Sequence, residues 1–241
     1  MKKIETRIVP QETPPKFYAQ HLKPYEFLSN EATGKTVLEV GCGDGYGSFY
    51  LTKVAAKVIG VDYESDIILR AQKEYKADNL KFICMDAIEL GFEDNSFDII
   101  CAFQVIEHIP EDKLLKFLAG IKRVLSDEGK FYLSTLNLEH AVKSLLTYKK
   151  NPAHCKEFDL RELRALLLKV FLSVDIYGVG LTLKHLVYQR IKRIGLFNFF
   201  PNGINPVDKF YNKVTTDDFI ITKHNLKKVI DFICICKKNI L

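Results

Sequence analysis

The sequence lacks the patterns that usually identify membrane and secreted proteins. It has no run of about 20 apolar residues, the length that a membrane-spanning helix needs. Met1–Glu5 begins like a signal peptide, but Thr6, Arg7 and the polar pair at 11–12 interrupt any hydrophobic core. No internal repeat and no low-complexity segment is present. These absences lead us to expect a cytoplasmic protein.

Metal-binding spacing is absent as well. The six cysteines form no C-x-x-C and no Cys/His pattern, and most of them lie inside apolar segments. We therefore interpret them as small buried hydrophobic residues rather than as metal ligands.

The charge balance gives little support for a nucleic-acid partner. The formal net charge is +5 over 241 residues, and acidic residues are interspersed among the basic ones. Neither a separate recognition domain nor an aromatic and basic binding module is apparent. The composition, 47% apolar and 27% charged, is that of a soluble globular protein, and the length predicts one domain over 1–241.

What the sequence does contain is a glycine-rich turn between a strand and a helix. The apolar run Thr36–Val40 has the composition of a buried strand, and glycines follow at 41, 43, 45 and 47. Helical spacing begins after Gly47, so free N–H groups lie at the turn. Glycines let a ligand lie directly on the backbone. The stretch 37–47 therefore predicts a site for a nucleotide-like ligand.

The spacing of these glycines argues against a dinucleotide. The G-x-G-x-x-G fingerprint requires a glycine three positions after Gly43, where Tyr46 stands. The second expected strand, Lys57–Asp62, ends in an acid about twenty positions beyond the turn, where a carboxylate can bind both ribose hydroxyls. A nicotinamide-dependent oxidoreductase is therefore disfavoured.

Four successive segments resemble the class I S-adenosylmethionine-dependent methyltransferases, within them the ubiquinone-biosynthesis-like, type 11 subgroup. The segments are Val37–Gly47, Gly60–Asp62, Cys84–Ala87 and Phe97–His108, in the order of the family. The resemblance implies an α/β Rossmann-like fold with a seven-stranded, mostly parallel sheet in the order 3-2-1-4-5-7-6. Helices on both faces and a helical lid insertion before the last strand are also implied. The implied activity is methyl transfer, with S-adenosyl-L-methionine as cofactor and S-adenosyl-L-homocysteine as product.

The remaining elements follow from hydrophobic periodicity. An N-terminal arm and a cap helix are expected within 1–30. Strands are expected over 36–40, 57–62, 80–84, 97–103, 130–136, 172–178 and 229–237, and helices over 16–29, 64–77, 111–126 and from 159 onward. By the resemblance, the last strand lies antiparallel between the fifth and the sixth.

The resemblance also assigns residues that bind the cofactor. The glycine turn would hold the methionine portion, Asp62 the ribose, and Asp86 with Ala87 the adenine. Tyr63 follows the ribose acid and either stacks on the adenine or packs inside the domain. The expected cofactor residues are Glu39, Gly41, Cys42, Gly43, Asp62, Tyr63, Asp86, Ala87 and Gln104.

Methyl transfer to a hydroxyl requires alignment of the reacting atoms and removal of a proton. A histidine suits the proton transfer, and His108 is the first candidate for the base, with His154 second. Each has the alternative of capping a helix or hydrogen bonding in the core. The candidate substrate residues are Tyr18, His21, Glu107 and Asn137. The first two stand on the cap helix, which either closes over the cofactor or forms an ordinary surface. No acidic cluster resembles that of the magnesium-dependent O-methyltransferases, so no catalytic metal is expected.

The segment Asn151–Glu157 bears on the acceptor. It resembles an Asn-Pro-x-His-x-x-Glu pattern of a bacterial subgroup that includes enzymes of sugar and cell-surface polysaccharide biosynthesis, although Ala153 replaces an expected aromatic residue. This predicts O-methylation of a sugar, nucleotide-sugar or glycan precursor. Val105–His108 also resembles the quinone-biosynthesis enzymes, so a quinone-type or other metabolite is an alternative. A second alternative is a non-catalytic cofactor-binding scaffold on the same fold. An N-methyltransferase is disfavoured because Asn/Asp-Pro-Pro-Tyr is absent.

The insertion 181–213 is basic and amphipathic. It carries six Lys or Arg residues against one acid, interleaved with apolar residues. Such a segment either contacts a membrane surface or an anionic substrate, or forms a lid whose apolar side packs on the domain and whose basic side is solvated. The expected partners are therefore a small-molecule substrate and, through 181–213, a peripheral membrane contact, with no prediction of oligomeric state.

Overall fold

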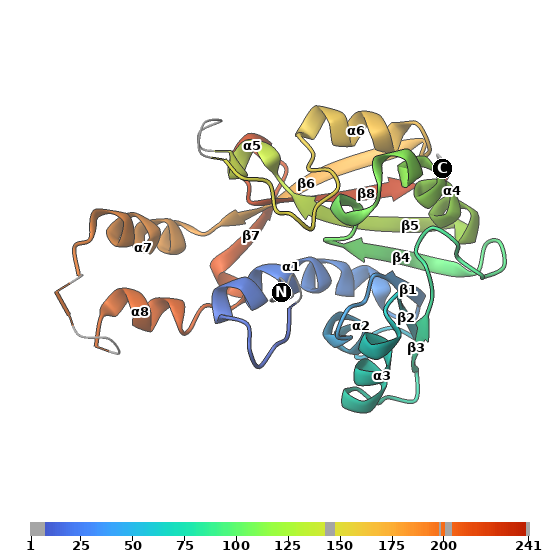
Figure 1. Cartoon of the computed structure of the whole chain (residues 1–241), viewed down its shortest axis with the longest axis horizontal. Coiled ribbons are helices and arrows are strands. Elements are labelled where there is room, and N and C mark those ends of the chain that lie inside the picture. The colour runs from blue at the N-terminus through green and yellow to red at the C-terminus, as the bar shows by residue number, and fades with distance from the viewer. Residues whose placement is uncertain (1–7, 143–147, 198, 201–203, 240–241) are drawn as a thin grey trace.

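The computed structural model describes residues 8–142, 148–197, 199–200 and 204–239. It shows one sheet in the order β3-β2-β1-β4-β5-β8-β6-β7, with helices packed on both faces (Figure 1). The strands are β1 (Thr36–Val40), β2 (Lys57–Asp62), β3 (Leu80–Cys84), β4 (Phe97–Phe103), β5 (Leu125–Leu136), β6 (Ser173–Leu181), β7 (Phe219–Thr222) and β8 (Asp231–Lys237). The helices are α1 (Pro15–Ala32), α2 (Tyr46–Leu51), α3 (Ser65–Glu74), α4 (Leu114–Val124), α5 (Leu138–Ala141), α6 (Leu160–Leu168), α7 (Leu183–Ile194) and α8 (Pro206–Tyr211).

The central strands are buried on both faces because their sequences are almost continuously apolar. In β4 all residues except Asp98 are buried. On one face, α4 and α6 pack against alternate side chains of the sheet, including Leu38 and Ile100. On the other face, α1 and α2 cover Val37 and Ile99. The resulting core holds the ends of the strands in fixed positions.

The strand order expected from the resemblance is confirmed, with one addition. β8 pairs antiparallel with β5 and with β6, so the last strand lies between them as expected. The expectation of seven strands is wrong by one, because β7 adds an eighth strand antiparallel to the edge of β6. β7 has only four residues and follows a polar turn, Thr215–Asp218, so its hydrophobic period is too short to be recognised.

The expected bounds are accurate for the first four strands and poorer afterwards. β1, β2, β3 and β4 begin and end where the sequence predicts. β5 begins at Leu125, inside the helix expected over 111–126, and continues through 127–129 into the strand expected over 130–136. The pairing of β4 with β5 shifts register between Phe97 and Ile99, which accommodates the irregular start of β5. The helix expected over 111–126 begins with a 3-10 turn, η2 (Glu111–Lys113).

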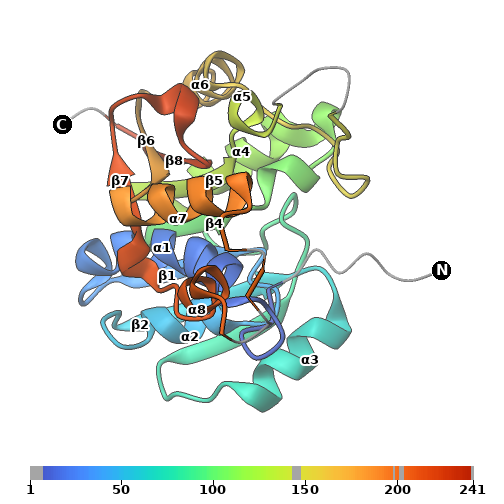
Figure 2. The same cartoon turned by 90° about the vertical axis from the view of Figure 1, so that its left-hand side faces the viewer.

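The insertion lies beyond the same edge of the sheet as the glycine turn. β6 is antiparallel to β8, which is antiparallel to β5, so β6 runs in the same direction as β1 and β5. α7 follows the carboxyl end of β6, and the glycine turn follows the carboxyl end of β1. Figure 2 looks toward α7 and α8 in front of the sheet. In parallel α/β sheets, ligands bind at this edge.

Candidate cofactor and active site

The glycine turn has the backbone conformation that only glycine adopts easily. Gly41 and Gly43 have φ angles of +74° and +51°. A Cβ atom on Gly41 would lie 2.5 Å from Cγ2 of Val105, so the turn packs closely on the segment after β4. A Cβ atom on Gly43 would meet no described atom within 4 Å. The backbone at Gly43 therefore borders open space that a ligand can occupy.

Asp62 is held against this turn at the end of β2. Its side-chain oxygens accept hydrogen bonds from the backbone N–H groups of Gly43 (3.0 Å) and Glu64 (3.1 Å). Each carboxylate oxygen has two lone pairs, so one on each oxygen remains after these bonds. That pair of acceptors fits the two hydroxyls of a ribose.

Asp44, in the same turn, adds a second feature that fits the cofactor. Its Oδ2 atom is buried and has no hydrogen-bond partner among the described residues. A buried oxygen without a partner is costly unless a ligand supplies one. The ammonium group of the methionine portion of S-adenosylmethionine is such a partner, so the residues present fit this cofactor.

The expected adenine side lies at the ends of β2 and β3. Asp86 is exposed, and its Oδ1 accepts a hydrogen bond from the N–H of Ile88 at 2.9 Å. Ala87 is partly buried beside it. Tyr63 is 70% exposed, and its hydroxyl donates to Glu64 at 2.9 Å. The ring of Tyr63 is therefore not packed in the interior of the domain.

Two expected cofactor residues have side chains buried behind the turn. Glu39 is 1% exposed, and its two oxygens accept hydrogen bonds from the hydroxyls of Tyr25 and Ser48. Burial raises the pKa of Glu39 to about 7. The Cys42 side chain is 4% exposed and packs in the cluster that contains Phe82. Through these two hydrogen bonds Glu39 joins α1 and α2 to β1. The side chain of Cys42 supports the turn from the core side.

Gln104 has a backbone conformation that is unusual for a residue with a side chain. Its φ angle is +57° directly after β4. Its N–H donates to the carbonyl of Ser134 at 2.9 Å, and its Nε2 donates to the Ser134 hydroxyl at 3.3 Å. Such strain, of order 1–3 kcal/mol, concentrates at functional sites. No pattern in the sequence predicts this conformation.

α1 packs against α2, the helix that follows the glycine turn. The ring of Tyr46 lies edge-on to those of Tyr18 and Tyr25, with centroids 5.6 Å apart in both pairs. His21 stands on the same helix, and burial lowers its pKa to about 4, so His21 is neutral at pH 7. Gln20 donates from Nε2 to Asp231 at 2.6 Å, which ties α1 to the start of β8.

The two candidate bases lie side by side but have different partners. Their rings are edge-to-face with centroids 5.0 Å apart. Nδ1 of His108 lies 2.9 Å from the carbonyl oxygen of Ala153. Because a carbonyl only accepts hydrogen bonds, Nδ1 carries the proton and Nε2 carries the lone pair. In neutral His108, Nε2 is therefore the ring nitrogen that can accept a proton.

Both nitrogens of His154 are already engaged. Nδ1 lies 2.7 Å from Oε1 of Glu157, and Nε2 lies 3.2 Å from Nδ2 of Asn151. Burial, with smaller effects of His108 and Lys150, lowers the pKa of His154 to about 4. Neutral His154 therefore donates to Glu157 and accepts from Asn151. No lone pair on this ring remains for a substrate proton.

Backbone hydrogen bonds fasten the segment 151–158 to η1 (Ile106–His108). The N–H groups of Cys155 and Lys156 donate to the carbonyl of Glu107 at 2.7 and 3.1 Å. The Cys155 thiol donates to the carbonyl of His108 at 3.3 Å. The sequence indicated His154 through its motif spacing, but it did not indicate that the carbonyl of Ala153 orients His108.

Glu107 and Asn137 are buried polar residues of the same region. Glu107 is 1% exposed, its Oε2 has no hydrogen-bond partner among the described residues, and burial raises its pKa to about 8. The fully buried Asn137 donates to the carbonyls of Leu226 (3.0 Å) and Val229 (2.9 Å), which holds the chain before β8. Asp231, which the sequence reasoning missed, is buried nearby, and its burial raises its pKa to about 6.

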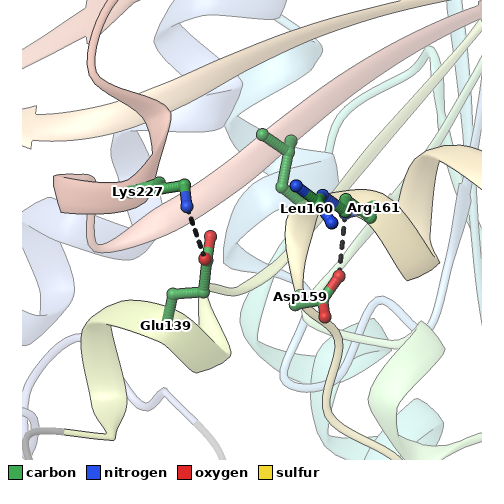
Figure 3. Close-up of a pocket in the computed structure, with 5 residues that line it drawn as sticks. All are labelled: Glu139, Asp159, Leu160, Arg161 and Lys227. Carbon is green, nitrogen blue, oxygen red and sulfur yellow. Dashed lines mark hydrogen bonds and ion pairs between the residues drawn. The ribbon is translucent and has the colours of Figure 1, made fainter.

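A separate pocket lies between α5, α6 and η4 (Leu226–Lys228). It is lined by Glu139, Asp159, Leu160, Arg161 and Lys227 (Figure 3). Glu139 forms an ion pair with Lys227 at 3.5 Å, and Asp159 caps α6 through the N–H groups of Arg161 and Glu162. None of the expected site residues lines it, so we assign it no part in the site.

Among the described residues, no group of three or more His, Cys, Asp or Glu side chains is arranged to hold a metal ion. No helix in the described part of the chain is long and apolar enough to cross a membrane.

Comparison with known sequences identifies relatives. Residues 38–133 match the family described as "Methyltransferase domain". Probable S-adenosylmethionine-dependent methyltransferases of Mycolicibacterium smegmatis and Mycobacterium tuberculosis are both 31% identical, over 68% of this chain. The matches cover 64% and 58% of those proteins, so the chain spans about three fifths of their length. A ubiquinone biosynthesis O-methyltransferase of Coxiella burnetii is 34% identical over 43% of this chain and 44% of its own.

Solved structures show the same fold. The YcgJ protein of Bacillus subtilis matches 91% of this chain and 100% of its own, with a TM-score of 0.58 and 21% identity. A methyltransferase of Thermotoga maritima, described as a possible histamine N-methyltransferase, matches 92% of this chain and 90% of its own, with a TM-score of 0.63 and 16% identity.

The fold and the turn define an α/β protein of the Rossmann-like class with a nucleoside-cofactor site. Residues 38–133 match the methyltransferase domain family, and the chain is similar to probable S-adenosylmethionine-dependent methyltransferases, whose cofactor the residues of the turn fit.

Proposed function

We propose that this chain transfers a methyl group from S-adenosylmethionine to a hydroxyl of a small molecule, with His108 as the base. The observation that carries the proposal is the tautomer of His108, whose Nδ1–H is held 2.9 Å from the Ala153 carbonyl. In this tautomer Nε2 keeps a lone pair that can accept a proton, which supports a catalytic role for His108.

The groups of the protein hold the cofactor in place and accept the proton of the acceptor. When bound, the cofactor supplies an activated methyl group on a sulfonium. The backbone at Gly43 and the carboxylate of Asp62 hold and orient it, while Tyr63 offers an exposed ring to the adenine. Nε2 of His108 removes the hydroxyl proton of the acceptor. The Ala153 carbonyl then keeps the imidazolium in place through Nδ1–H.

The other expected site residues support this arrangement in different ways. His154, with Asn151 and Glu157, positions the segment that carries the Ala153 carbonyl. Glu39 and Cys42 support the turn, and Tyr18 and His21 form part of the roof over it. Gln104 lies between the turn and β5, where we infer that cofactor and acceptor meet.

For the acceptor we propose a polyhydroxylated compound: a sugar, nucleotide-sugar or glycan precursor. The observation that supports it is the resemblance of Asn151–Glu157 to the sugar-related pattern. A quinone-type acceptor is the second candidate, because a relative at 34% identity is named a ubiquinone biosynthesis O-methyltransferase.

The test begins with calorimetric titration of the protein with S-adenosylmethionine and S-adenosylhomocysteine, with NADH as the control. We expect binding of the first two only. Methyl transfer is then measured with nucleotide-sugars and with phenolic quinone precursors, and sugar products are expected. Phenolic products would move the assignment to the second candidate. Cofactor binding without transfer to either class, in a protein whose His108→Ala variant behaves identically, would favour the scaffold.

A further inference from the structure

The helix α7 packs on the protein through its polar and aromatic side. His185 is fully buried, with ring centroids 5.4 Å from Phe210 and 5.3 Å from Phe219. Tyr188 stacks on Phe210 at 4.1 Å, and Lys192 lies over the ring of Tyr211 at 4.7 Å. Residues 185, 188 and 192 share one face of a helix. This face is occupied by contacts with α8 and β7.

The apolar side of α7 faces away from the protein. The exposed fractions are 78% for Leu183, 46% for Leu186, 49% for Val187 and 66% for Ile194. At about 100° per residue, these four side chains lie on one face, opposite His185. The lid interpretation, in which the apolar side packs on the domain, is therefore wrong for α7. Ordinary surface helices bury this stripe.

The apolar exposure continues past the end of the helix. Leu196 is 51% exposed and Phe199 is 76% exposed. We call the set Leu183, Leu186, Val187, Arg190, Arg193, Ile194, Leu196 and Phe199 the α7 outer face. Exposed apolar side chains that gather in one place mark an interaction site rather than the scattered exposure of ordinary surfaces.

The charge of the α7 outer face selects the kind of partner. Between residues 183 and 200 the sequence has four Lys or Arg residues and no acid. Lys184 is paired with Asp218 at 3.3 Å, and Lys192 lies on Tyr211, so these two cations are engaged by the protein. Arg190 and Arg193 are exposed on or beside the apolar stripe. Apolar side chains flanked by arginines match a surface that has an apolar interior beneath an anionic outer layer.

We propose that the α7 outer face docks this protein on membranes that contain anionic lipids. α7 has 12 residues and lies parallel to such a surface, with its apolar side chains among the acyl chains and its arginines at the phosphates. The proposal does not depend on the acceptor or on His108, because it rests only on how α7 is packed.

The test is co-sedimentation of the full chain with vesicles. Vesicles of phosphatidylcholine alone are compared with vesicles of phosphatidylcholine and phosphatidylglycerol. We expect binding to the anionic vesicles that weakens as salt is raised, and little binding to the neutral ones. Absence of binding by the wild-type protein, or equal binding to both kinds of vesicle, would overturn the proposal.

Two pairs of variants separate this face from general surface properties. Leu186→Glu is compared with Leu69→Glu, because Leu69 is 63% exposed on α3. Arg190→Glu with Arg193→Glu is compared with Arg70→Glu with Lys73→Glu, also on exposed positions of α3. We expect the α7 variants to bind anionic vesicles more than roughly 20-fold less tightly and the α3 variants to lose far less. Equal losses in both members of a pair would show a net-charge effect and overturn the proposal.

A second copy of the chain is the competing occupant of this face. Sedimentation velocity of wild-type and Leu186→Glu protein, without vesicles, tests it. A wild-type dimer that this variant converts to a monomer, together with no vesicle binding, would assign the face to self-association instead. Circular dichroism and calorimetric binding of S-adenosylmethionine show that each variant is folded.

Discussion

The proposed cofactor side and the proposed acceptor side of this protein are built in different ways. Around Gly43 and Asp62, the site consists of backbone groups and one carboxylate at the ends of consecutive strands. Around His108, it consists of side chains held by a segment more than forty residues away, through the carbonyl of Ala153. Proteins that bind the same cofactor need the same residue types at the same spacing in the sequence. An acceptor site depends instead on which distant segments the fold brings together.

The largest effect is expected where the acceptor side does chemistry. His108→Ala should lower kcat by about 10²–10⁴, the usual contribution of a general base, and leave the affinity for S-adenosylmethionine unchanged. Steady-state methyl transfer and calorimetry measure the two quantities. His224→Ala, at an exposed histidine, is the matched control. Full activity of His108→Ala would remove it as the base.

A substitution on the proposed cofactor side should instead weaken the affinity for S-adenosylmethionine. Asp62→Ala removes the carboxylate that faces the glycine turn, and we expect the Kd for S-adenosylmethionine to rise by roughly 10–100-fold, as for loss of hydrogen bonds to a charged group. Asp66→Ala changes an exposed acid on α3 and should leave the Kd unaltered. An unchanged Kd in folded Asp62→Ala protein would contradict the ribose assignment.

A smaller effect tests the link between the segment 151–158 and the base. His154→Ala removes the bonds to Glu157 and Asn151, so the Ala153 carbonyl is held less firmly and kcat should fall by about tenfold with cofactor affinity retained. Nitrogen NMR of the His108 ring should show a mixture of tautomers in this variant and a single one in the wild type.

Lys149→Ala, at an exposed position just before this segment, is the control for His154→Ala and should alter neither the rate nor the tautomer. If His154→Ala abolishes turnover while His108→Ala retains it, the two histidines exchange roles.

The smallest effect is on stability and depends on pH. Burial raises the pKa of Glu107 from 4.5 to about 8, so between these values the folded protein keeps a proton that the unfolded chain releases. The free energy of unfolding therefore falls as pH rises through this window. Glu107→Gln, which mimics the protonated form, should melt several degrees higher than the wild type at pH 8 and differ little at pH 5. The control, Glu128→Gln, is exposed and should melt like the wild type at both pH values.

The sequence predicted those parts of the molecule that local patterns determine. β1 to β4 are short, largely apolar runs, and their predicted bounds were confirmed. The place of β8 followed from the family resemblance and was confirmed. The positions of Asp62 and of the turn agree with the expected cofactor site, although the assigned contacts stay predictions.

Other features arise only from tertiary contacts. The positive φ of Gln104 depends on the packing of Ser134, and the tautomer of His108 on a backbone carbonyl that any residue at 153 could supply. The outward direction of the apolar side of α7 depends on how His185 and Tyr188 meet Phe210. None of these has a period or a motif that a single sequence displays.

The helix α1 has two parts, before and after Pro24, that are held by different contacts. Pro24 lies inside this helix and has no N–H to donate to the carbonyl one turn earlier. The part after Pro24 is anchored to β1 through Tyr25 and buries Leu28 and Ala32. The part before Pro24 carries Tyr18, whose ring lies against Tyr46, and is tied to β8 through the bond of Gln20 to Asp231. The two halves of α1 are therefore anchored to different strands, the second half to β1 and the first half to β8.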